Sequence, residues 1–345
     1  MPGDPEVAVI VGAYGRREYL LRAVRTVLAQ TVGRDRVEIR VTKDFADPEV
    51  DAALAELRIP STVDADPRIG TWLGRAIAAT RAPLIAFLDD DDEFEPERLE
   101  RVLEVFRQHP EVGFYRNRVR VIDGSGRPVP VDRWRPIETD LEFDGTGPIL
   151  LPPGPKAGAL ALGTERTHSS FNSSTMVVRR ELLTGSLGTA FAETQTPDLF
   201  LFLAGVLGPY GLFLDDRRLT RFRRYEGNVT RRIGWLAAAA HSYRSAGGAA
   251  REFGRPEFGD WLEARADHFD RMYRGATLVS RVRDRADRRE VARLAIEYAR
   301  FLDRHPAERA LTLDTWGAAV YALGYLFVPS LTCRVEARRR AGLPA

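Results

Sequence analysis

Four consecutive aspartates, Asp89 to Asp92, directly follow an apolar run at residues 83–88. Like charges at this spacing repel one another, and the end of a strand leaves the carboxylates little room to separate. A divalent cation such as Mg²⁺ or Mn²⁺ would offset the repulsion, because these hard ions prefer carboxylate oxygens. The alternative is a solvated acidic turn before a helix, since aspartate stabilises helix N-termini. The elements around the aspartates bear on this choice.

The apolar run belongs to an alternation of predicted strands and helices. Strands are predicted at residues 7–11, 37–41, 61–63 and 84–88. Apolar residues at helical spacing predict helices around residues 20–28, 47–57, 73–77 and 96–106, the last with Pro96 in its first turn. Such alternation implies a parallel sheet with right-handed crossovers. The loops at residues 12–16, 42–45 and 89–92 should therefore converge at the carboxyl ends of the strands, where such sheets bind nucleotides.

The middle of the chain has mixed signals. Residues 112–123 and 127–131 flank Gly124-Ser125-Gly126, which predicts a β-hairpin, and residues 144–165 are expected to form a long loop. A strand is predicted at residues 173–179, and a helix begins at Thr196-Pro197-Asp198. Residues 212–214 and 219–223 suggest two short edge strands, and from Trp235 onward the chain is expected to be helical and is rich in arginine.

Composition bounds the class of protein. The chain has 345 residues and 44% hydrophobic content, enough for one large or two medium globular domains. A net charge of +2 offers no general field for nucleic acid. The single cysteine, Cys333, excludes an internal disulfide and a cysteine-based zinc site, and it makes a reducing, cytoplasmic compartment the default expectation.

Residues 315–333 carry no charged side chain and are followed by Arg334 and by three arginines at 338–340. The segment approaches the length that spans a membrane, but Gly317, Gly324 and Pro329 interrupt it. One interpretation is a peripheral contact of residues 315–340 with the cytoplasmic membrane face. The alternatives are a buried helix on the catalytic domain and a dimer interface.

Five ordered segments resemble the inverting GT-A glycosyltransferases of family 2. They cover residues 9–31, Phe87 to Leu99 with the aspartates, residues 173–183, Thr196-Pro197-Asp198 and residues 221–230. The resemblance spans roughly residues 5–232. It implies a GT-A fold, which is a nucleotide-binding, Rossmann-like, mostly parallel α/β sheet flanked by helices. Residues 1–110 would form the nucleotide-sugar-binding half and residues 111–232 the acceptor-binding half, with residues 233–345 as a helical C-terminal region that contacts membrane or oligomerises.

The resemblance also implies the activity. It predicts a metal-dependent, non-processive enzyme that moves a sugar from a UDP- or GDP-sugar to a hydroxyl of a glycan or polyprenyl-linked acceptor. Mn²⁺ or Mg²⁺ would be held by Asp91 with Asp89, and Asp90 or Asp92 could share their tasks. Asp198 is the candidate general base, with Glu193 as the alternative base and a helix-capping role for Asp198 as the alternative function. The residues expected to bind the nucleotide-sugar are Ala13, Tyr14, Arg16, Asp44, Gly70, Asp89 and Asp90.

Several positions depart from the family pattern. Lys43 replaces an expected aspartate after the second strand, and Pro197 replaces the acidic residue before Asp198. The Gln-x-x-Arg-Trp motif is replaced by Arg231-Arg-Ile-Gly-Trp235, which argues against a processive synthase. Two other classes stay open. One is a nucleotidyltransferase of related fold, although residues 12–16 are a poor triphosphate loop. The other is a non-catalytic protein that binds a divalent metal or a nucleotide.

Overall fold

The computed structural model describes residues 4–129, 147–154, 172–225 and 233–305, together with residues 318, 322 and 326. The chain forms two compact units, one of residues 1–226 and 248–255 and the other of residues 227–247 and 256–345. This division does not test which parts of the chain bind the donor, bind the acceptor, or contact membrane. The functions predicted for residues 1–110, 111–232 and 233–345 therefore stay predictions.

The first unit is built on one sheet of nine strands in the order β3-β2-β1-β4-β8-β6-β9-β5, with β7 also paired to β9. Strands β3, β2, β1 and β4 are parallel, β8 is antiparallel to both β4 and β6, and β6 and β9 are parallel neighbours. The strands are β1 (Val7–Ala13), β2 (Val37–Lys43), β3 (Ser61–Val63), β4 (Leu84–Asp89), β5 (Glu93–Phe94), β6 (Val112–Ile122), β7 (Ile149–Leu151), β8 (Met176–Arg179) and β9 (Gly211–Arg223). The predicted α/β fold is confirmed.

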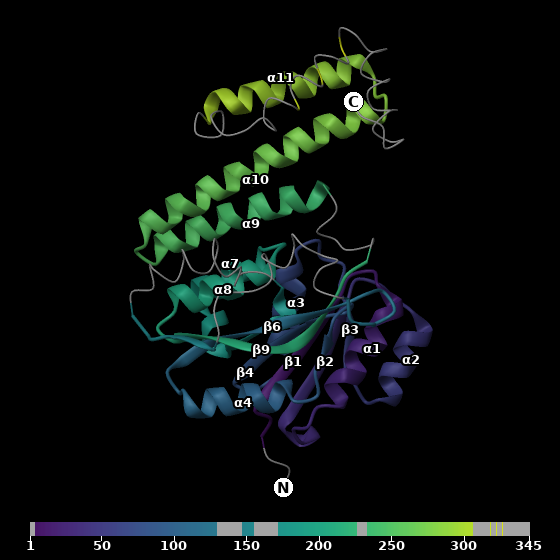
Figure 1. Ribbon diagram of the computed structural model, residues 1–345, viewed down its shortest axis with the longest axis vertical. Helices are drawn as coiled ribbons and strands as arrows, with labels where there is room; N and C mark the ends of the chain where they lie inside the picture. The colour runs from purple at the N-terminus through teal and green to yellow at the C-terminus, as the bar shows by residue number, and fades with distance from the viewer. Residues whose placement is uncertain are drawn as a thin grey trace. The chain divides into compact units, whose positions relative to one another are not determined.

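Helices cover both faces of this sheet (Figure 1). One face carries α1 (Arg17–Leu28), α2 (Pro48–Glu56) and α4 (Arg98–Gln108), and the other carries α3 (Ile69–Ala78), α7 (Gly185–Ala192) and α8 (Pro197–Leu207). Short 3₁₀ turns lie at Arg34–Arg36, Ser173–Thr175 and Arg180–Leu183. The strands and helices predicted before residue 108 are all present, but Pro96 lies in a turn before α4 because that helix begins at Arg98.

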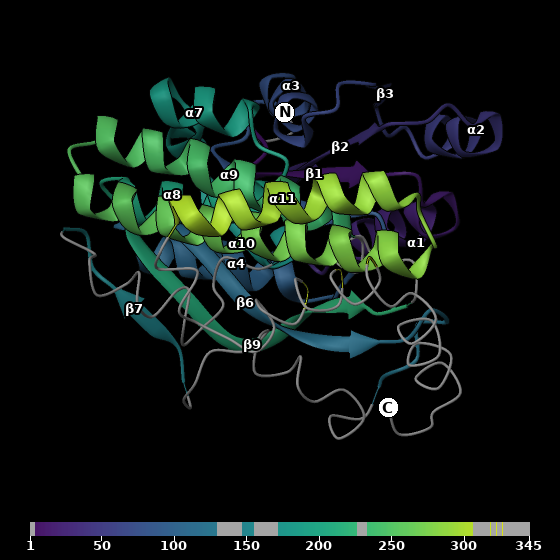
Figure 2. The ribbon, with the colours of Figure 1, turned by 90° about the horizontal axis from the view of Figure 1, so that it is seen from above.

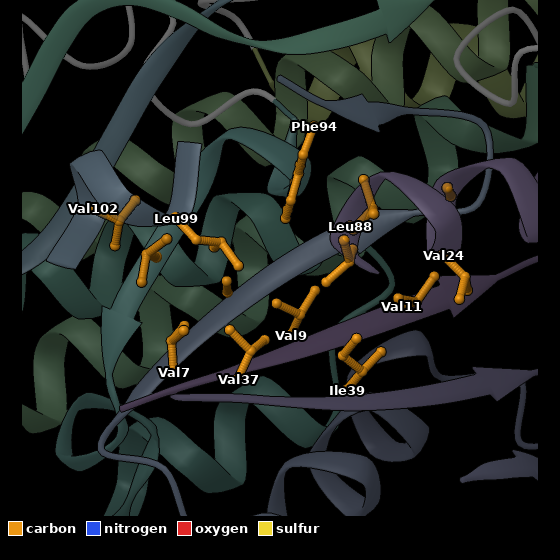
Figure 3. Packing of buried hydrophobic residues seen from close by; sticks show 14 of the residues in the cluster. Val7, Val9, Val11, Val24, Val37, Ile39, Leu88, Phe94, Leu99 and Val102 are labelled. Atoms are coloured by element: carbon orange, nitrogen blue, oxygen red, sulfur yellow. The ribbon is translucent and has the colours of Figure 1, made fainter. Parts of the chain in front are cut away.

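The alternation of side chains along β1 explains how the layers are held together. Val7, Val9 and Val11 point to one face and pack with side chains from β2, α1 and α4 (Figure 3). The intervening residues of β1 are buried as well, since helices cover both faces of the sheet. Helix α2 begins at Pro48 because the side chain of Asp47 accepts hydrogen bonds from the first free backbone N–H groups. This packing holds the carboxyl ends of the parallel strands in fixed positions.

The expectation of two short edge strands at residues 212–214 and 219–223 is wrong. These residues belong to one 13-residue strand, β9, which lies between β6 and β5 in the order of the sheet. Figure 2 shows β9 as one long strand near β6. The charged residues between the two apolar stretches suggested a break. In the structure the pairing with β6 continues past them with a register irregularity, and Asp215 is buried against Arg101 and Tyr115.

Two other predictions for the middle of the chain are tested in part. The turn around Gly124 is confirmed, because the backbone N–H of Asp123 donates to the carbonyl of Arg127 at 2.8 Å and that of Val129 donates to Val121 at 3.0 Å. Residues 130–131 lie outside the described part of the chain. The predicted long loop at 144–165 contains the strand β7, which pairs with β9.

The second unit contains most of α9 (Ile233–Glu252), α10 (Pro256–Arg283) and α11 (Arg288–Arg304), so the prediction of a helical C-terminal region is confirmed for residues 233–304. Its core joins α10 and α11 with Ala318, Ala322 and Leu326, the three described residues of the apolar segment. Among the described residues, we find no helix that combines the length and the apolar character needed to cross a membrane. The membrane contact of residues 315–340 stays a prediction.

Gly70 fixes the approach of α3 to α7 within the first unit. Its backbone N–H donates to the carbonyl of Thr194 at 2.9 Å. A Cβ at this position would lie 1.7 Å from the carbonyl oxygen of Phe191, a distance that no side chain can tolerate. Gly70 is therefore required by helix packing, and its predicted contact with the donor stays a separate prediction.

We expect Gly70→Ala to lower the free energy of unfolding by about 1–3 kcal/mol, the usual effect of overpacking. The matched control is Gly74→Ala on the same helix, where a Cβ would meet nothing within 4 Å. This control should be neutral or stabilising by up to about 1 kcal/mol, because alanine is the better helix former. Denaturant unfolding of both variants measures the difference, and equal stability of the two would contradict the packing argument.

Candidate active site

Three predicted loops meet at the carboxyl edge of the parallel strands. The backbone N–H of Gly15 donates to Asp44 Oδ1 at 2.8 Å, which joins the loop after β1 to the loop after β2. The N–H of Tyr14 donates to Asp90 Oδ2 at 3.0 Å, and the N–H of Asp90 donates to the carbonyl of Gly12 at 3.0 Å. The predicted convergence of these loops is confirmed.

The four aspartates divide into a group of three and a single residue. Asp89, Asp91 and Asp92 each offer one carboxylate oxygen, and these oxygens lie within 4.8 Å of one another. Carboxylate oxygens at this spacing are the hard donors that Mg²⁺ and Mn²⁺ prefer, so the residues fit such an ion. Asp90 instead lies 2.5 Å from the Arg16 guanidinium and accepts from the backbone N–H of Tyr14. Asp90 therefore anchors the loop after β1.

Arg16 forms ion pairs with two of the four aspartates. Its Nη2 lies 2.5 Å from Asp90 Oδ1, and its Nη1 donates to Asp91 Oδ2 at 2.7 Å. These ion pairs partly offset the repulsion among the carboxylates. Arg16 is therefore engaged within the cluster and is not an ordinary surface charge of a loop. Its predicted contact with the nucleotide-sugar stays a prediction.

Burial perturbs the acidity of the whole cluster. It raises the pKa of Asp90 to about 8 and that of Asp91 to about 6, against the opposing attraction of Arg16. The pKa values of Asp89 and Asp92 are also raised, again chiefly by burial. Raised values mean that the folded chain holds these carboxylates at a cost when they are ionised. A cation bound beside them would remove part of that cost.

A turn at residues 172–175 lies beside the aspartates, so the strand predicted at residues 173–179 begins only at Met176. Asn172 donates through Nδ2 to Asp92 Oδ2 at 3.0 Å, and Ser173 Oγ donates to Asp89 Oδ1 at 3.0 Å. Ser174 Oγ accepts from the backbone N–H of Asp89 at 3.0 Å. The only signal in the sequence was the Asn-Ser-Ser tripeptide before a strand, which is typical of a local capping turn.

Asp198 lies at the start of α8, next to this turn. Its Oδ2 accepts from the backbone N–H of Asn172 at 3.2 Å, and its Oδ1 accepts from the N–H of Leu199 at 3.0 Å. Burial raises the pKa of Asp198 to about 6, a value suited to a general base near neutral pH. Glu193, the alternative base, is exposed and lies 2.7 Å from Arg68 in an ion pair.

The end of β9 also contacts the aspartates. The backbone N–H of Arg223 donates to Asp92 Oδ1 at 2.9 Å, and its Nε donates to the carbonyl of Asp91 at 2.8 Å. Tyr225 donates its hydroxyl to Asp91 Oδ2 at 3.3 Å and packs edge-on against Tyr19. The fully buried Arg223 side chain also pairs with Glu93, so its charge serves the fold around the aspartates.

The remaining predicted donor residues are on the adjacent strand ends. Tyr14 is 43% exposed, and Asp44 is exposed next to it. Ala13 is buried at the end of β1, and its carbonyl accepts from the N–H of Asp44 at 3.1 Å. Lys43, which stands where an aspartate was expected, is fully buried and lies 2.9 Å from Asp51 in an ion pair. Its charge is therefore used within the fold.

Known proteins match the region of the chain that contains the four aspartates. Residues 8–161 match the profile of glycosyl transferase family 2, a range that contains the four aspartates and ends before Asp198. An uncharacterized glycosyltransferase of Nostoc is 29% identical over 130 residues, which are 36% of this chain and 39% of that protein. The succinoglycan biosynthesis protein ExoO of Rhizobium meliloti is 34% identical over 104 residues, or 29% of each chain. The chain thus matches well under half the length of these curated relatives.

Solved structures resemble the chain over most of its length. Residues 1–349 of S. aureus TarS in complex with UDP have a TM-score of 0.51 at 14% identity, and the match covers 95% of this chain and 82% of that one. The mannosyltransferase PcManGT from Pyrobaculum calidifontis, in complex with GDP-Man and Mn²⁺, has a TM-score of 0.50 at 13% identity and covers 95% and 89%. At this identity the likeness shows the fold. Residues 8–161 are thus similar to glycosyl transferase family 2, and the chain has a mixed α/β fold of the GT-A type, as the resemblance implies.

Proposed function

We propose that this chain is a metal-dependent, inverting, non-processive glycosyltransferase. It moves a sugar from a UDP- or GDP-sugar to a hydroxyl of a glycan or lipid-linked acceptor. The observation that carries the proposal is the grouping of Asp89, Asp91 and Asp92 at the strand ends, with the buried carboxyl of Asp198 joined to it through Asn172. A cation held by the group of carboxylates would stabilise the leaving diphosphate, and the separate carboxylate would accept the proton of the acceptor hydroxyl.

The donor side uses the loops after β1, β2 and β4. A Mn²⁺ or Mg²⁺ ion held by Asp89, Asp91 and Asp92 would act as a Lewis acid toward the leaving diphosphate. The exposed ring of Tyr14 and the exposed carboxylate of Asp44 lie on the neighbouring loops, where they are available to a nucleoside. TarS has been crystallised with UDP and with UDP-GlcNAc, and PcManGT with GDP-Man, which supports a donor of this class.

The acceptor side uses Asp198. The acceptor oxygen attacks the anomeric carbon as the bond from that carbon to the diphosphate oxygen breaks, and the departing diphosphate keeps the electron pair. The hydroxyl proton passes to the carboxylate of Asp198, which later returns it to solvent. Attack from the side opposite to the diphosphate inverts the configuration. The hydrogen bonds from the N–H groups of Asn172 and Leu199 orient the Asp198 carboxylate for this step.

The geometry favours glycosyl transfer over nucleotidyl transfer. A nucleotidyltransferase must hold a triphosphate, and the loop after β1 should supply free positive charge for it. The single basic residue of that loop is Arg16, whose guanidinium is engaged with Asp90 and Asp91. The separate, buried Asp198 also has a clear task in transfer to a hydroxyl.

Metal binding is tested by thermal stability. Mn²⁺ together with UDP or GDP should raise the melting temperature of the wild type by a few degrees, since about 2.7 kcal/mol is gained at a ligand concentration one hundred times Kd. Asp91→Asn should abolish the gain. The control is Asp35→Asn, an exposed aspartate just before β2 at the opposite edge of the sheet, which should keep the full shift. An unchanged shift in Asp91→Asn would exclude Asp91 as a metal ligand.

The base is tested by separating binding from turnover. Asp198→Asn should bind the donor nucleotide with near wild-type affinity, while kcat falls about 10²–10⁴-fold, the usual contribution of a general base. Calorimetry measures the first quantity and steady-state kinetics the second. Glu193→Gln, which removes the alternative base, should retain turnover. Wild-type kcat in Asp198→Asn would remove Asp198 from the mechanism.

The pH dependence follows from the raised pKa of Asp198. The carboxyl must be ionised to accept a proton, so kcat at saturating Mn²⁺ and donor should rise with pH and level off above about 6. Below the pKa, kcat should fall about tenfold per pH unit because the fraction of ionised base falls by that factor. Glu193→Gln should show the same inflection. A flat profile between about pH 5 and 8 would contradict this assignment, since the inflection of kcat reports the base in the bound complex.

A further inference from the structure

We propose that Asn172 is a positioning residue that holds the metal-binding carboxylates and the general base in one fixed arrangement. The inference rests on the proposed function and names a further residue for it. Asn172 lies directly before the 3₁₀ turn Ser173–Thr175 and is 5% exposed. Its side chain and its backbone both contact carboxylates of the candidate site, so it can act through the groups that it orients.

Asn172 contacts both halves of the site at once. Its side-chain Nδ2 donates to Asp92 Oδ2 at 3.0 Å, and its backbone N–H donates to Asp198 Oδ2 at 3.2 Å. The two acceptors come from distant parts of the chain, one after β4 and the other in the first turn of α8. One residue thereby joins a carboxylate of the metal group to the carboxylate of the base.

The backbone of Asn172 is held in an uncommon conformation that makes both contacts. Its φ is +66°, in the region that residues with a side chain adopt at a cost and that asparagine tolerates better than most. The side-chain Oδ1 accepts from the N–H of Ser174 at 2.8 Å, and the carbonyl accepts from the N–H of Thr175 at 3.0 Å. The side chain of Asn172 thus stabilises the conformation that directs its own N–H to Asp198.

The turn is fixed relative to the aspartates by the sheet. Strand β8 follows the turn and pairs with β4, with Val177 opposite Ala86. Ser173 Oγ donates to Asp89 Oδ1 at 3.0 Å, so the turn contacts the metal group at Asp89 as well as at Asp92. A change in the turn should therefore alter metal binding and base geometry together.

Two substitutions at Asn172 separate its side chain from its backbone. Asn172→Gly removes Nδ2 and Oδ1 but accepts a positive φ without strain, so the N–H can still reach Asp198. We expect Mn²⁺ affinity to fall about 10–100-fold, as for the loss of other groups that orient metal ligands. Excess Mn²⁺ should restore kcat to within about threefold of wild type, because the base keeps its hydrogen bond.

Asn172→Ala removes the same atoms and also disfavours the positive φ. We expect the same loss of Mn²⁺ affinity, and in addition a kcat that stays at least about tenfold low at saturating Mn²⁺, because the N–H leaves Asp198. Ser173→Ala, a milder change that leaves the backbone alone, should weaken Mn²⁺ binding several-fold. Calorimetry of Mn²⁺ binding without donor gives a readout that is independent of activity.

Arg58 supplies the matched control. It is an exposed residue with a φ of +54° at the end of α2, on the edge of the sheet opposite to the site. Arg58→Gly and Arg58→Ala repeat the backbone change, so they should alter stability while leaving Mn²⁺ affinity and kcat at wild-type values.

Wild-type Mn²⁺ affinity in both Asn172→Gly and Ser173→Ala would overturn the proposal for the metal half. Equal kcat of the two Asn172 variants at saturating Mn²⁺ would overturn it for the base half. A wild-type chain that neither binds Mn²⁺ nor transfers sugar would instead refute the proposed function, and this result is distinct from the other two.

Discussion

Repulsion among the buried carboxylates after β4 is the constraint on which the rest of the site depends. Burial raises the pKa of each aspartate, which is the signature of charge held away from water. Hydrogen-bond donors from three parts of the chain contact these carboxylates. The guanidinium of Arg16 comes from the loop after β1, the amide of Asn172 from the turn before β8, and the backbone N–H of Arg223 from the end of β9. No single contact balances the cluster, and the carboxylates keep their positions because the donors are distributed.

The order of strands explains why these donors arrive together. Strand β4 lies between β1 and β8, so the turn that carries the aspartates has the loop after β1 on one side and Asn172 on the other. Strand β9 reaches the same edge by running parallel to β6 through a register irregularity, and its last residue is Arg223. A break in β9 at its charged stretch would remove the support for Asp92. The irregular pairing therefore has a consequence for the candidate site as well as for the sheet.

The sequence predicts the features of this chain that depend on local pattern. Alternating and helical periodicities predicted every α-helix up to residue 108 and every strand except the two-residue β5. The four aspartates stood out because charge follows an apolar run, and Asp198 was named from the family resemblance. Features that depend on contacts between distant residues were not predicted. Nothing near Asn172 in the sequence indicates that its amide will meet Asp92, eighty residues earlier. The ion pair of Lys43 with Asp51 likewise could not be inferred from the sequence. The sequence indicated two strands in place of β9, because nothing in it shows that the buried Asp215 has partners on α4 and β6.

The partition of the four aspartates bears on the order of events under the proposed function. Arg16 already pairs with Asp90 and Asp91, and one guanidinium cannot balance four carboxylates. A nucleotide-sugar brings a diphosphate with its own negative charge to the same edge of the sheet. Without further positive charge the two anions would repel each other at short range, where the low dielectric of a buried site strengthens the effect. Under the proposed function, a cation bound before the diphosphate or together with it would supply that charge. Because Asp91 belongs to the metal group and also pairs with Arg16, a cation bound at Asp91 would compete with that ion pair, and the two equilibria would then be coupled.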